Sequence, residues 1–317
     1  MVNETSEVWQ LILNPHAGGG RGTRDRDKMV RMLKKSGIVL QLSVSQYPGH
    51  SIKLACDLAI QGATRFIVAG GDGTLNEVVN GIFSCGNELC RKVTIAMLPV
   101  GTGNDWIKTF GIPDDYQQAI DIIKRGKCVY QDLGEISYEI DGQLHKRYFA
   151  NSAGFGFDAV VANQANRMKE KGASGLKVYI LSLIRSYLAY RSVPTTFTID
   201  GNPVSVMLFS GSVGIGKFSG GGMMQVPDAN PLNGKLHVTL IRKIGIWGIL
   251  TNFRGLYSGK FIRDRRVSTH TGTHIEIEAE RLLPGEADGE SLGNGRFAIR
   301  VIPQQLRVVY GSDDFLK

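Results

Sequence analysis

Two hydrophobic periodicities alternate along the first 130 residues. Short apolar runs, which are typical of buried strands, occur at Val8–Leu13, Ile38–Ser45, Phe66–Ala69 and Val93–Leu98. Segments with helical spacing or with helix start and stop residues occur at Thr23–Ser36, Ser51–Gln61, Leu75–Ile82 and Asp114–Arg125, and Ser51 is the expected N-cap of the second. Because strands that alternate with helices form parallel sheets covered on both faces, this half is predicted to be an α/β domain.

The pattern changes after residue 130, where strands dominate. The predicted strands are Val129–Ile140, Leu144–Asn151, Thr195–Ile199, Pro203–Val213, Lys235–Ile241, His274–Ala279, Phe297–Val301 and Gln305–Tyr310. Asp141-Gly142 and Asp200-Gly201 are typical of two-residue hairpin turns. Helical patterns interrupt the strands at Leu176–Tyr190 and Ile246–Tyr257. The second half is therefore predicted to be a mainly antiparallel β domain with two helical insertions.

Size and charge support two domains and an anionic partner. The chain has 317 residues, whereas single hydrophobic cores stop growing near about 250–300 residues. The 37 basic and 29 acidic residues give a net charge of +8, which suits a nucleotide or an anionic membrane and is also ordinary for solubility. The basic residues are scattered without interleaved aromatic residues, so no nucleic-acid partner is expected.

The cysteines and the apolar segments bear on the location of the chain. Cys56, Cys85, Cys90 and Cys128 form no C-x-x-C pair, so we expect reduced thiols instead of a zinc site or a disulfide framework. Met1–Gln10 is polar, unlike a signal peptide, and no run of about 18 charge-free apolar residues occurs. We therefore expect a cytoplasmic protein that touches a membrane without spanning it.

The strongest chemical signal is the segment Gly70-Gly71-Asp72-Gly73-Thr74-Leu75-Asn76-Glu77, between a predicted strand and a predicted helix. Glycines let backbone N–H groups approach a ligand, and a helix N-terminus favours an anion. Asp72 would repel phosphate unless Mg²⁺ lies between them or unless it acts as a base. The segment predicts a phosphate-binding loop, although a tight strand–helix turn alone would also explain the glycines.

Two further loops follow predicted strands. Pro99–Asp105 contains Gly101-Thr102-Gly103-Asn104-Asp105, and Asn14-Pro15-His16 is followed by Ala17 and three glycines. Loops at the carboxyl ends of parallel strands converge on one crevice, so the three loops are predicted to face one ligand. His16 is better explained as a loop residue near phosphate than as a catalytic group.

These segments resemble the diacylglycerol kinase catalytic family, which includes bacterial lipid kinases and sphingosine kinases. The family pattern has an Asn-Pro start, a GGDGTxNE loop and a GTGND loop, in this order. Gly156–Ala159, the stretch from Gly220 to Ala229, and Asp288-Gly289-Glu290 also resemble it, so the similarity covers essentially the whole chain. It implies an α/β domain similar to NAD kinases and phosphofructokinases (1–130, with 303–317 returning to it) and a C-terminal antiparallel β-sandwich that binds lipid (131–302), with the active site in the cleft between them.

The resemblance also implies the site residues. ATP would contact Asn14, Pro15, His16, Ala17, Gly18, Ser45, Gly70, Gly71, Asp72, Gly73, Thr74, Leu75, Asn76, Thr102 and Asn104. Ser45 stands where a threonine is usual and keeps the hydroxyl. Asp72 matches the Mg²⁺-associated acid, and Asp288 and Glu290 match the acidic catalytic pair. A lipid hydroxyl needs a carboxylate base, and the sequence does not choose between Asp288 and Glu290.

One expected metal site departs from the family pattern. A structural metal turn, Asp-Asp-Gly-x-Leu-Asp in bacterial members, corresponds to Leu232–His237 here. Its ligands would come from Asn230, Asn233 and Lys235. Because Mg²⁺ and Ca²⁺ prefer hard oxygen ligands and Lys235 adds a positive charge, we expect weak binding or none.

The expected partners are ATP, Mg²⁺ and a lipid at a membrane surface. Peripheral contact would use the apolar faces of Leu176–Leu188 and of Trp247–Tyr257, although packing on the sandwich is the better explanation of these faces. Asp158 could meet the lipid head group, and a polar residue with satisfied hydrogen bonds at a domain junction would explain it equally well. A homodimer is compatible with the sequence, which carries no signal for an oligomeric state.

Two alternatives to a lipid kinase remain. An NAD kinase-like small-molecule kinase shares the Gly-Gly-Asp-Gly loop, but the second glycine loop and the long β-rich half favour a lipid substrate. A catalytically inactive nucleotide- or lipid-binding module would be expected to lack an acid, yet Asp72, Asp288 and Glu290 are all present.

Overall fold

The computed structural model describes residues 8–86, 90–170, 186–187, 190–243, 245 and 254–313. The chain divides into two compact units, which we call the first unit (Met1–Leu133 with Pro303–Lys317) and the second unit (Gly134–Ile302). Within the described ranges, no helix is long and apolar enough to cross a membrane.

The first unit contains a parallel sheet in the order β2-β1-β3-β4-β15. Its strands are β1 (Trp9–Leu13), β2 (Leu40–Val44), β3 (Arg65–Gly70), β4 (Thr94–Pro99) and the last residues of β15 (Phe297–Val309). All of β1 and β4 is buried, as expected of strands covered on both faces. Arg307 of β15 pairs with Thr94 of β4, so the C-terminal strand extends this sheet.

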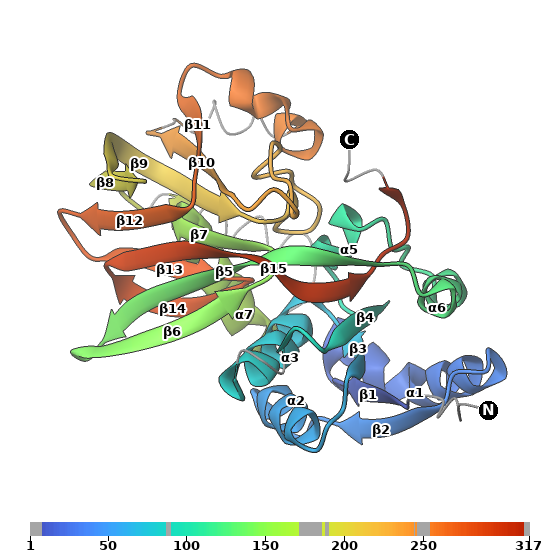
Figure 1. Ribbon diagram of the computed structural model, residues 1–317. Coiled ribbons are helices and arrows are strands. Elements are labelled where there is room, and N and C mark those ends of the chain that lie inside the picture. The colour runs from blue at the N-terminus through green and yellow to red at the C-terminus, as the bar shows by residue number, and fades with distance from the viewer. Residues whose placement is uncertain are drawn as a thin grey trace. The chain divides into compact units, whose positions relative to one another are not determined.

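Helices cover both faces of this sheet (Figure 1). They are α1 (Ala17–Lys35), α2 (His50–Ile60), α3 (Asp72–Ser84), the short α5 (Asp105–Thr109) and α6 (Tyr116–Arg125). The helices α2 and α3 pack together, and α1 packs beside α6. The helix predicted to end at Arg125 does end there, because Gly126 adopts the left-handed conformation that glycine accepts readily.

Two sequence predictions about α2 are wrong. Gly49, not Ser51, is the N-cap residue, and the Ser51 hydroxyl is buried without a hydrogen-bond partner. Cys56 on α2 forms a disulfide with Cys85, which follows the end of α3, whereas we expected reduced thiols. The packing of α2 on α3 brings their Cα atoms to 5.8 Å. Their separation of 29 residues in the sequence gives no hint of this pairing.

The second unit is built of antiparallel strands. They are β5 (Cys128–Ile140), β6 (Gln143–Phe149), β7 (Ser152–Gly156), β8 (Val193–Ile199), β9 (Asn202–Gly214), β10 (Leu236–Arg242), β11 (Val267–Gly272), β12 (His274–Ala279), β13 (Leu283–Ala287), β14 (Glu290–Gly295) and the first part of β15. Neighbouring strands pair in the order β14-β13-β7-β9-β8-β12-β15. In addition, β10 pairs with β9 and with β11, and β5 pairs with β15 and with β6. The helix α7 (Phe157–Glu170) follows β7, and a short 3₁₀ helix spans Lys260–Arg263.

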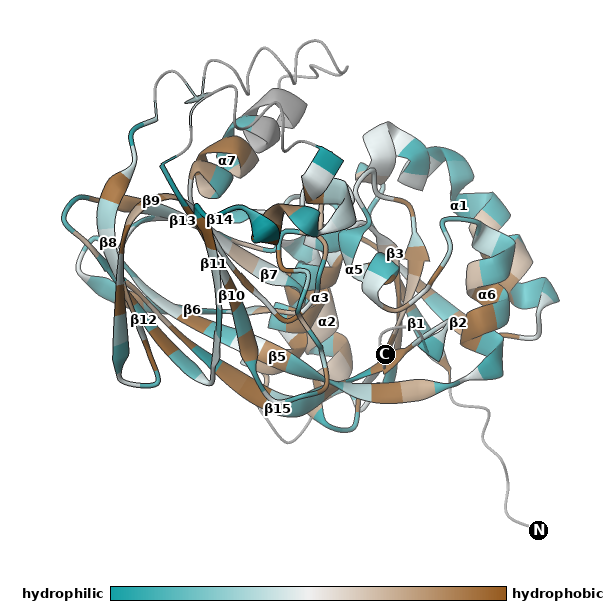
Figure 2. Ribbon diagram, turned by 90° about the horizontal axis from the view of Figure 1, so that it is seen from above, coloured by the Kyte–Doolittle hydropathy of each residue, from teal (hydrophilic) through white to brown (hydrophobic). Residues whose placement is uncertain are grey.

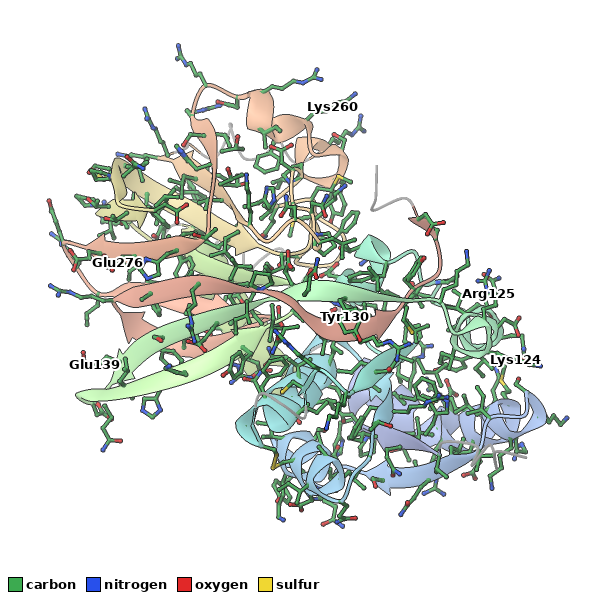
Figure 3. The ribbon with its side chains drawn as sticks, in the orientation of Figure 1. Lys124, Arg125, Tyr130, Glu139, Lys260 and Glu276 are labelled. Carbon is green, nitrogen blue, oxygen red and sulfur yellow. A yellow bond between two sulfur atoms is a disulfide. The ribbon has the colours of Figure 1, made fainter. Side chains whose placement is uncertain are left out.

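One face of these strands forms the hydrophobic core. Phe149, Phe155, Phe197 and Ile277 are fully buried within it. Along β12, buried and exposed residues alternate, as expected of a strand with one face on the core, and Figure 2 shows this alternation in hydropathy. Glu276 lies on the exposed face of β12 and is labelled in Figure 3.

The predicted hairpins are confirmed and several strands were missed. Asp141-Gly142 and Asp200-Gly201 have positive φ at both positions and join β5 to β6 and β8 to β9. The strands predicted at Phe297–Val301 and Gln305–Tyr310 are parts of one strand, β15. The sequence pattern missed β7, β11, β13, β14 and α7. Most of the helices predicted at Leu176–Tyr190 and Ile246–Tyr257 lies outside the described residues.

Candidate active site

Four loops of the first unit leave the sheet at one edge. Leu13 is in register with Val44 and Ala69, and Gly70 is in register with Pro99. Asn14, Ser45, Gly71 and Val100 directly follow these strand ends. The loops therefore lie side by side, as the strand pattern predicted for the loops after β1, β3 and β4. The strand order reverses at β1, where open α/β sheets bind their ligands.

The loop after β1 is tied to the loop after β3. The Asn14 side chain donates from Nδ2 to Thr74 Oγ1 at 3.0 Å, and its Oδ1 accepts the backbone N–H of His16 at 3.0 Å. Gly18 has φ +60°, and a Cβ there would collide with the carbonyl oxygen of Val100. The position therefore excludes other residues, and the first turn of α1 passes close to the loop after β4.

The two glycine loops pack backbone against backbone. The N–H groups of Val100 and Gly101 donate to the Gly70 carbonyl at 2.8 and 3.0 Å. A Cβ added to Gly101 would lie 2.5 Å from the Cα of Gly71. This approach explains glycine at both positions, because any side chain would push the loops apart.

Asp72 connects these two loops. Its Oδ2 accepts the N–H of Asp105 at 3.0 Å and its Oδ1 accepts that of Trp106 at 2.9 Å, so it caps the start of α5. Burial raises the pKa of Asp72, and the nearby Asp105 raises it further, whereas the two N–H groups lower it. Lys108 pairs with Asp105 at 2.7 Å. A carboxylate accepts about four hydrogen bonds, so Asp72 keeps oxygen lone pairs for a Mg²⁺ ion, which its hard oxygens fit.

Glu77 has a role that the sequence analysis missed. Its Oε1 accepts the N–H of Gly49 at 2.9 Å and its Oε2 accepts that of Ser51 at 3.2 Å. Glu77 thus caps α2 from α3, and a carboxylate at a helix N-terminus is favoured by the helix dipole. The buried Ser45 lies just upstream and donates its N–H to Leu13. Glu77 is the last residue of the GGDGTxNE motif, which was the one sign of a role for it. The N–H groups that it accepts lie 26 to 28 residues away in the sequence.

The other predicted nucleotide residues differ in exposure. His16 and Thr102 are exposed, whereas Asn76 is fully buried and Thr74 and Leu75 are nearly so. Asn104 donates from Nδ2 to Gly101 O at 3.0 Å and to Asp114 Oδ1 at 2.9 Å, so it holds the loop in shape. Pro15 and Ala17 flank His16 at the start of α1, and Gly73 lies in the first turn of α3.

The acidic motif of the second unit forms a hairpin turn. Asp288 and Gly289 have φ of 48° and 85°, and Ala287 pairs with Glu290, which begins β14. The Asp288 carboxylate accepts the N–H groups of Ala150, Asn151 and Ser152 at 2.9, 3.1 and 3.0 Å. Asp288 therefore anchors the turn to residues 150–152, where β7 begins. Glu290 is partly exposed.

Two further acids lie beside this turn. Asp158 in the first turn of α7 accepts from Ser212 Oγ at 2.8 Å and from Gln225 Nε2 at 3.2 Å, and burial raises its pKa. Glu286 is 5% exposed and accepts the Gly289 N–H at 2.6 Å. Burial raises the pKa of Glu286 to about 8. Glu286 stands two residues before Asp288 and was not among the predicted site residues.

The predicted structural metal turn is closed by its own hydrogen bonds. Asn230 Oδ1 accepts the Leu232 N–H at 3.0 Å, and Asn233 Oδ1 accepts the Lys235 N–H at 3.1 Å. Asn233 Nδ2 lies 3.0 Å from His237 Nε2. With both amide oxygens engaged and Lys235 exposed beside them, these residues do not fit a divalent cation. Among the described residues, no three His, Cys, Asp or Glu side chains gather as a metal-binding group.

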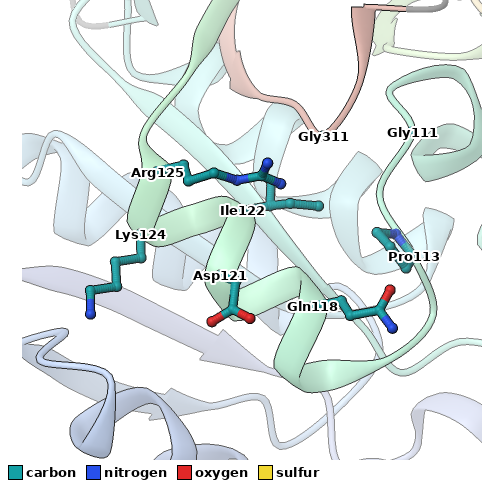
Figure 4. A pocket seen from close by; sticks show the side chains of 8 residues that line it. All are labelled: Gly111, Pro113, Gln118, Asp121, Ile122, Lys124, Arg125 and Gly311. Carbon is teal, nitrogen blue, oxygen red and sulfur yellow. The ribbon is translucent and has the colours of Figure 1, made fainter.

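A surface hollow lies elsewhere in the first unit. A shallow groove of 740 Å³ is lined by Gly111, Pro113, Gln118, Asp121, Ile122, Lys124, Arg125 and Gly311 (Figure 4). None of the predicted site residues lines it. The candidate site is therefore defined by the converging loops and not by the volume of a cavity.

These features define a class: an α/β protein whose parallel sheet presents phosphate-type loops at one edge, joined to an antiparallel β unit with an acidic hairpin. Comparison with known families gives the same result. The diacylglycerol kinase catalytic domain matches residues 8–136, and the YegS C-terminal NAD kinase beta sandwich-like domain matches residues 151–310. The chain belongs to this family of kinases, and it is an enzyme with a kinase catalytic domain.

Similar proteins cover nearly the full length. A Yersinia enterocolitica protein named "Probable lipid kinase YegS-like" is 27% identical over 94% of this chain and 95% of its own. The crystal structure of a diacylglycerol kinase from Bacillus anthracis has a TM-score of 0.76 and 25% identity, and covers 96% of this chain and 97% of its own. Yeast NADH kinase shares the fold, with a TM-score of 0.55 and 13% identity over 98% of this chain and 86% of its own.

Proposed function

We propose that this enzyme transfers the γ-phosphoryl group of ATP to the hydroxyl of a diacylglycerol-like or sphingoid lipid. The observation that carries the proposal is the convergence of the loops after β1, β2, β3 and β4 at one edge of the parallel sheet. The names of the similar proteins from Yersinia and Bacillus support a lipid as the acceptor.

The first unit would bind the nucleotide. The loops held together by Asn14, Thr74 and Asp72 would present backbone N–H groups and the start of α3 to the phosphates. Exposed Thr102 and His16 would contact ATP from neighbouring loops. Mg²⁺ held at Asp72 would neutralise phosphate charge.

The second unit would supply the base. The substrate hydroxyl oxygen attacks the γ-phosphorus, the bond to the bridging oxygen of ADP breaks, and the hydroxyl proton passes to a carboxylate. Glu290 is assigned this role because the Asp288 carboxylate already accepts three backbone N–H groups. Asp288 is then a positioning residue, which separates the roles of two acids that the sequence leaves equivalent.

The lipid would be met at a membrane surface by a cytoplasmic enzyme. The net charge of +8 favours an anionic membrane. Asp158, with its donors Ser212 and Gln225, would contact the polar head group. The apolar segments predicted to touch the membrane lie mostly outside the described residues. Their support for membrane contact comes from their sequence pattern alone.

The test is a phosphorylation assay with a panel of acceptors. Purified protein is incubated with Mg²⁺ and γ-labelled ATP, and with micellar diacylglycerol, monoacylglycerol, ceramide, sphingosine or phosphatidylglycerol. We expect label in one lipid class, a loss of about 10²–10⁴-fold in kcat for Glu290→Gln, and a strong loss for Asp72→Asn. The matched control is Glu276→Gln, which removes a charge from the exposed face of β12.

An NAD kinase-like activity is the second candidate, because yeast NADH kinase shares the fold. NAD⁺ therefore runs beside the lipids. Label in NAD⁺ alone would contradict the lipid assignment and leave the nucleotide site intact. Full activity of Glu290→Gln would contradict the assigned base.

A further inference from the structure

Glu286 lies where the acidic hairpin meets the rest of the second unit. It is the penultimate residue of β13 and is 5% exposed. Its Oε2 accepts the N–H of Gly289, the second residue of the turn, at 2.6 Å. Its Oε1 faces β7, so that a Cβ added to Gly154 would lie 2.5 Å from this oxygen. Glycine at position 154 thus makes room for a buried carboxyl group.

Two carboxylates hold the turn at Asp288-Gly289 in place. Asp288 binds the N–H groups of residues 150–152 on one side, and Glu286 binds Gly289 from within the hairpin. Glu290 follows Gly289 directly. The direction of the Glu290 side chain therefore depends on the contacts of both Asp288 and Glu286, because no residue separates Gly289 from the start of β14.

The charged groups acting on Glu286 are acids. Asp158 on α7, Asp288 in the turn and Glu290 on β14 each raise its pKa, and burial is the largest cause. The Gly289 N–H lowers the pKa, and the resulting value is about 8. Asp158 has its own donors in Ser212 and Gln225, and Asp288 has three N–H groups. Glu286 accepts a single backbone N–H and is the member of the group best suited to hold a proton at neutral pH.

We propose that Glu286 is a positioning residue for Glu290 and that it acts in its uncharged form. Its carboxyl fixes the turn at Gly289 without adding a negative charge beside the acid that takes the substrate proton. The inference rests on the proposed function for the role of Glu290. The uncharged state of Glu286 can be measured without any substrate.

The kinetic test compares two substitutions at this position. Glu286→Gln is the isostere of the uncharged acid and retains most of kcat at pH 7. Glu286→Ala removes the contact with Gly289 and lowers kcat by roughly 10- to 100-fold, with KM for ATP unchanged, because the base is misplaced. In the wild type, kcat declines as the pH rises through about 8, where Glu286 ionises beside Glu290. Glu286→Gln lacks this decline, whereas Glu276→Gln keeps it.

A second readout does not depend on activity. The folded protein holds the Glu286 proton up to about pH 8, whereas the unfolded chain releases it near the ordinary glutamate pKa of about 4.3. Across this window the folded state binds more protons, so its stability declines as the pH rises. The Tm of the wild type should therefore fall relative to that of Glu286→Gln between about pH 5 and 8. Glu276→Gln should follow the wild type.

Two results would overturn the proposal: Glu286→Gln as inactive as Glu290→Gln, or parallel Tm curves for the wild type and Glu286→Gln across the window. A wild type that phosphorylates no lipid would instead remove the proposed function. The Tm comparison would then still support or overturn an uncharged Glu286.

Discussion

Carboxylates that accept backbone N–H groups serve different purposes in the two units. In the first unit, Asp72 and Glu77 each accept two backbone N–H groups at the N-terminus of a helix. In the second unit, Asp288 accepts three N–H groups from residues 150–152 at the start of β7, while Glu286 accepts one. Burial is the largest cause that raises the pKa of Glu286, and the neighbouring Asp158, Asp288 and Glu290 raise it further, to about 8.

The difference shows that an acid in a conspicuous motif is often a fastening for the backbone. The most recognisable motifs of the chain contain Asp72, Glu77 and Asp288. Each of these carboxylates accepts hydrogen bonds from backbone N–H groups of another segment. Glu290 differs because it begins β14 directly after a turn that two other acids, Asp288 and Glu286, hold in place. Substitutions that remove one fastening at a time will test this comparison.

The largest effect on stability is expected from Asp288→Ala. The substitution leaves three N–H groups without their charged acceptor, at a cost of about 3 kcal/mol in the free energy of unfolding. Urea unfolding followed by circular dichroism measures the change. Asp141→Ala is the matched control, since Asp141 occupies an Asp-Gly turn with nearly the same φ and is exposed. Equal losses in the two variants would mean that the turn conformation, and not the fastening, sets the cost.

A smaller effect is expected from Glu77→Gln. The amide keeps one acceptor oxygen but loses the charge that faces the start of α2, at a cost of about 1 kcal/mol. KM for ATP should rise, because the segment between Ser45 and Gly49 loses its anchor. Asp57→Asn, which removes an exposed acid from α2, should change neither quantity. An unchanged KM in Glu77→Gln would separate the cap from the nucleotide site.

The smallest effect is expected from Asp200→Asn, in a hairpin of the second unit. The exposed Asp200 carboxylate accepts the N–H groups of Thr273 and His274, which hold its pKa below the usual range. After allowance for solvent screening, the loss is about 0.5 kcal/mol near neutral pH. Because the folded-state pKa is depressed, the wild type should lose this advantage as the pH falls below about 4. Tm measured against pH for both proteins checks this, and a constant difference down to pH 2 would contradict it.

Much of the first unit could be predicted because its signals are local. Apolar runs, helix stops and glycine loops each act within a few residues, and the rule that parallel strands share a carboxyl edge brought Asn14, Gly71 and Gly101 together. The cap of α2 escaped prediction because its acid comes from α3. The Cys56–Cys85 disulfide escaped for the same reason.

The second unit was harder because several of its strands oppose local preference. The strands β7 and β13 read SAGFG and LPGEA, with glycine or proline where strands usually carry β-branched residues. They are strands because their neighbours supply the hydrogen bonds, and Gly154 leaves space for Glu286. The third Asp-Gly turn, at Asp288, carried the same signal as the two hairpins that were predicted.

By itself, the sequence determined the two-part architecture, the order of the phosphate-type loops and the acids available for chemistry, because each depends on residue type and short-range spacing. Only the tertiary structure decided what each acid does. Asp288 fastens a turn, Glu77 caps a distant helix and Glu286 is buried among other acids. The roles of Asp288 and Glu77 depend on backbone N–H groups that the fold places within about 3 Å of each carboxylate, and segments far apart in the chain supply these groups.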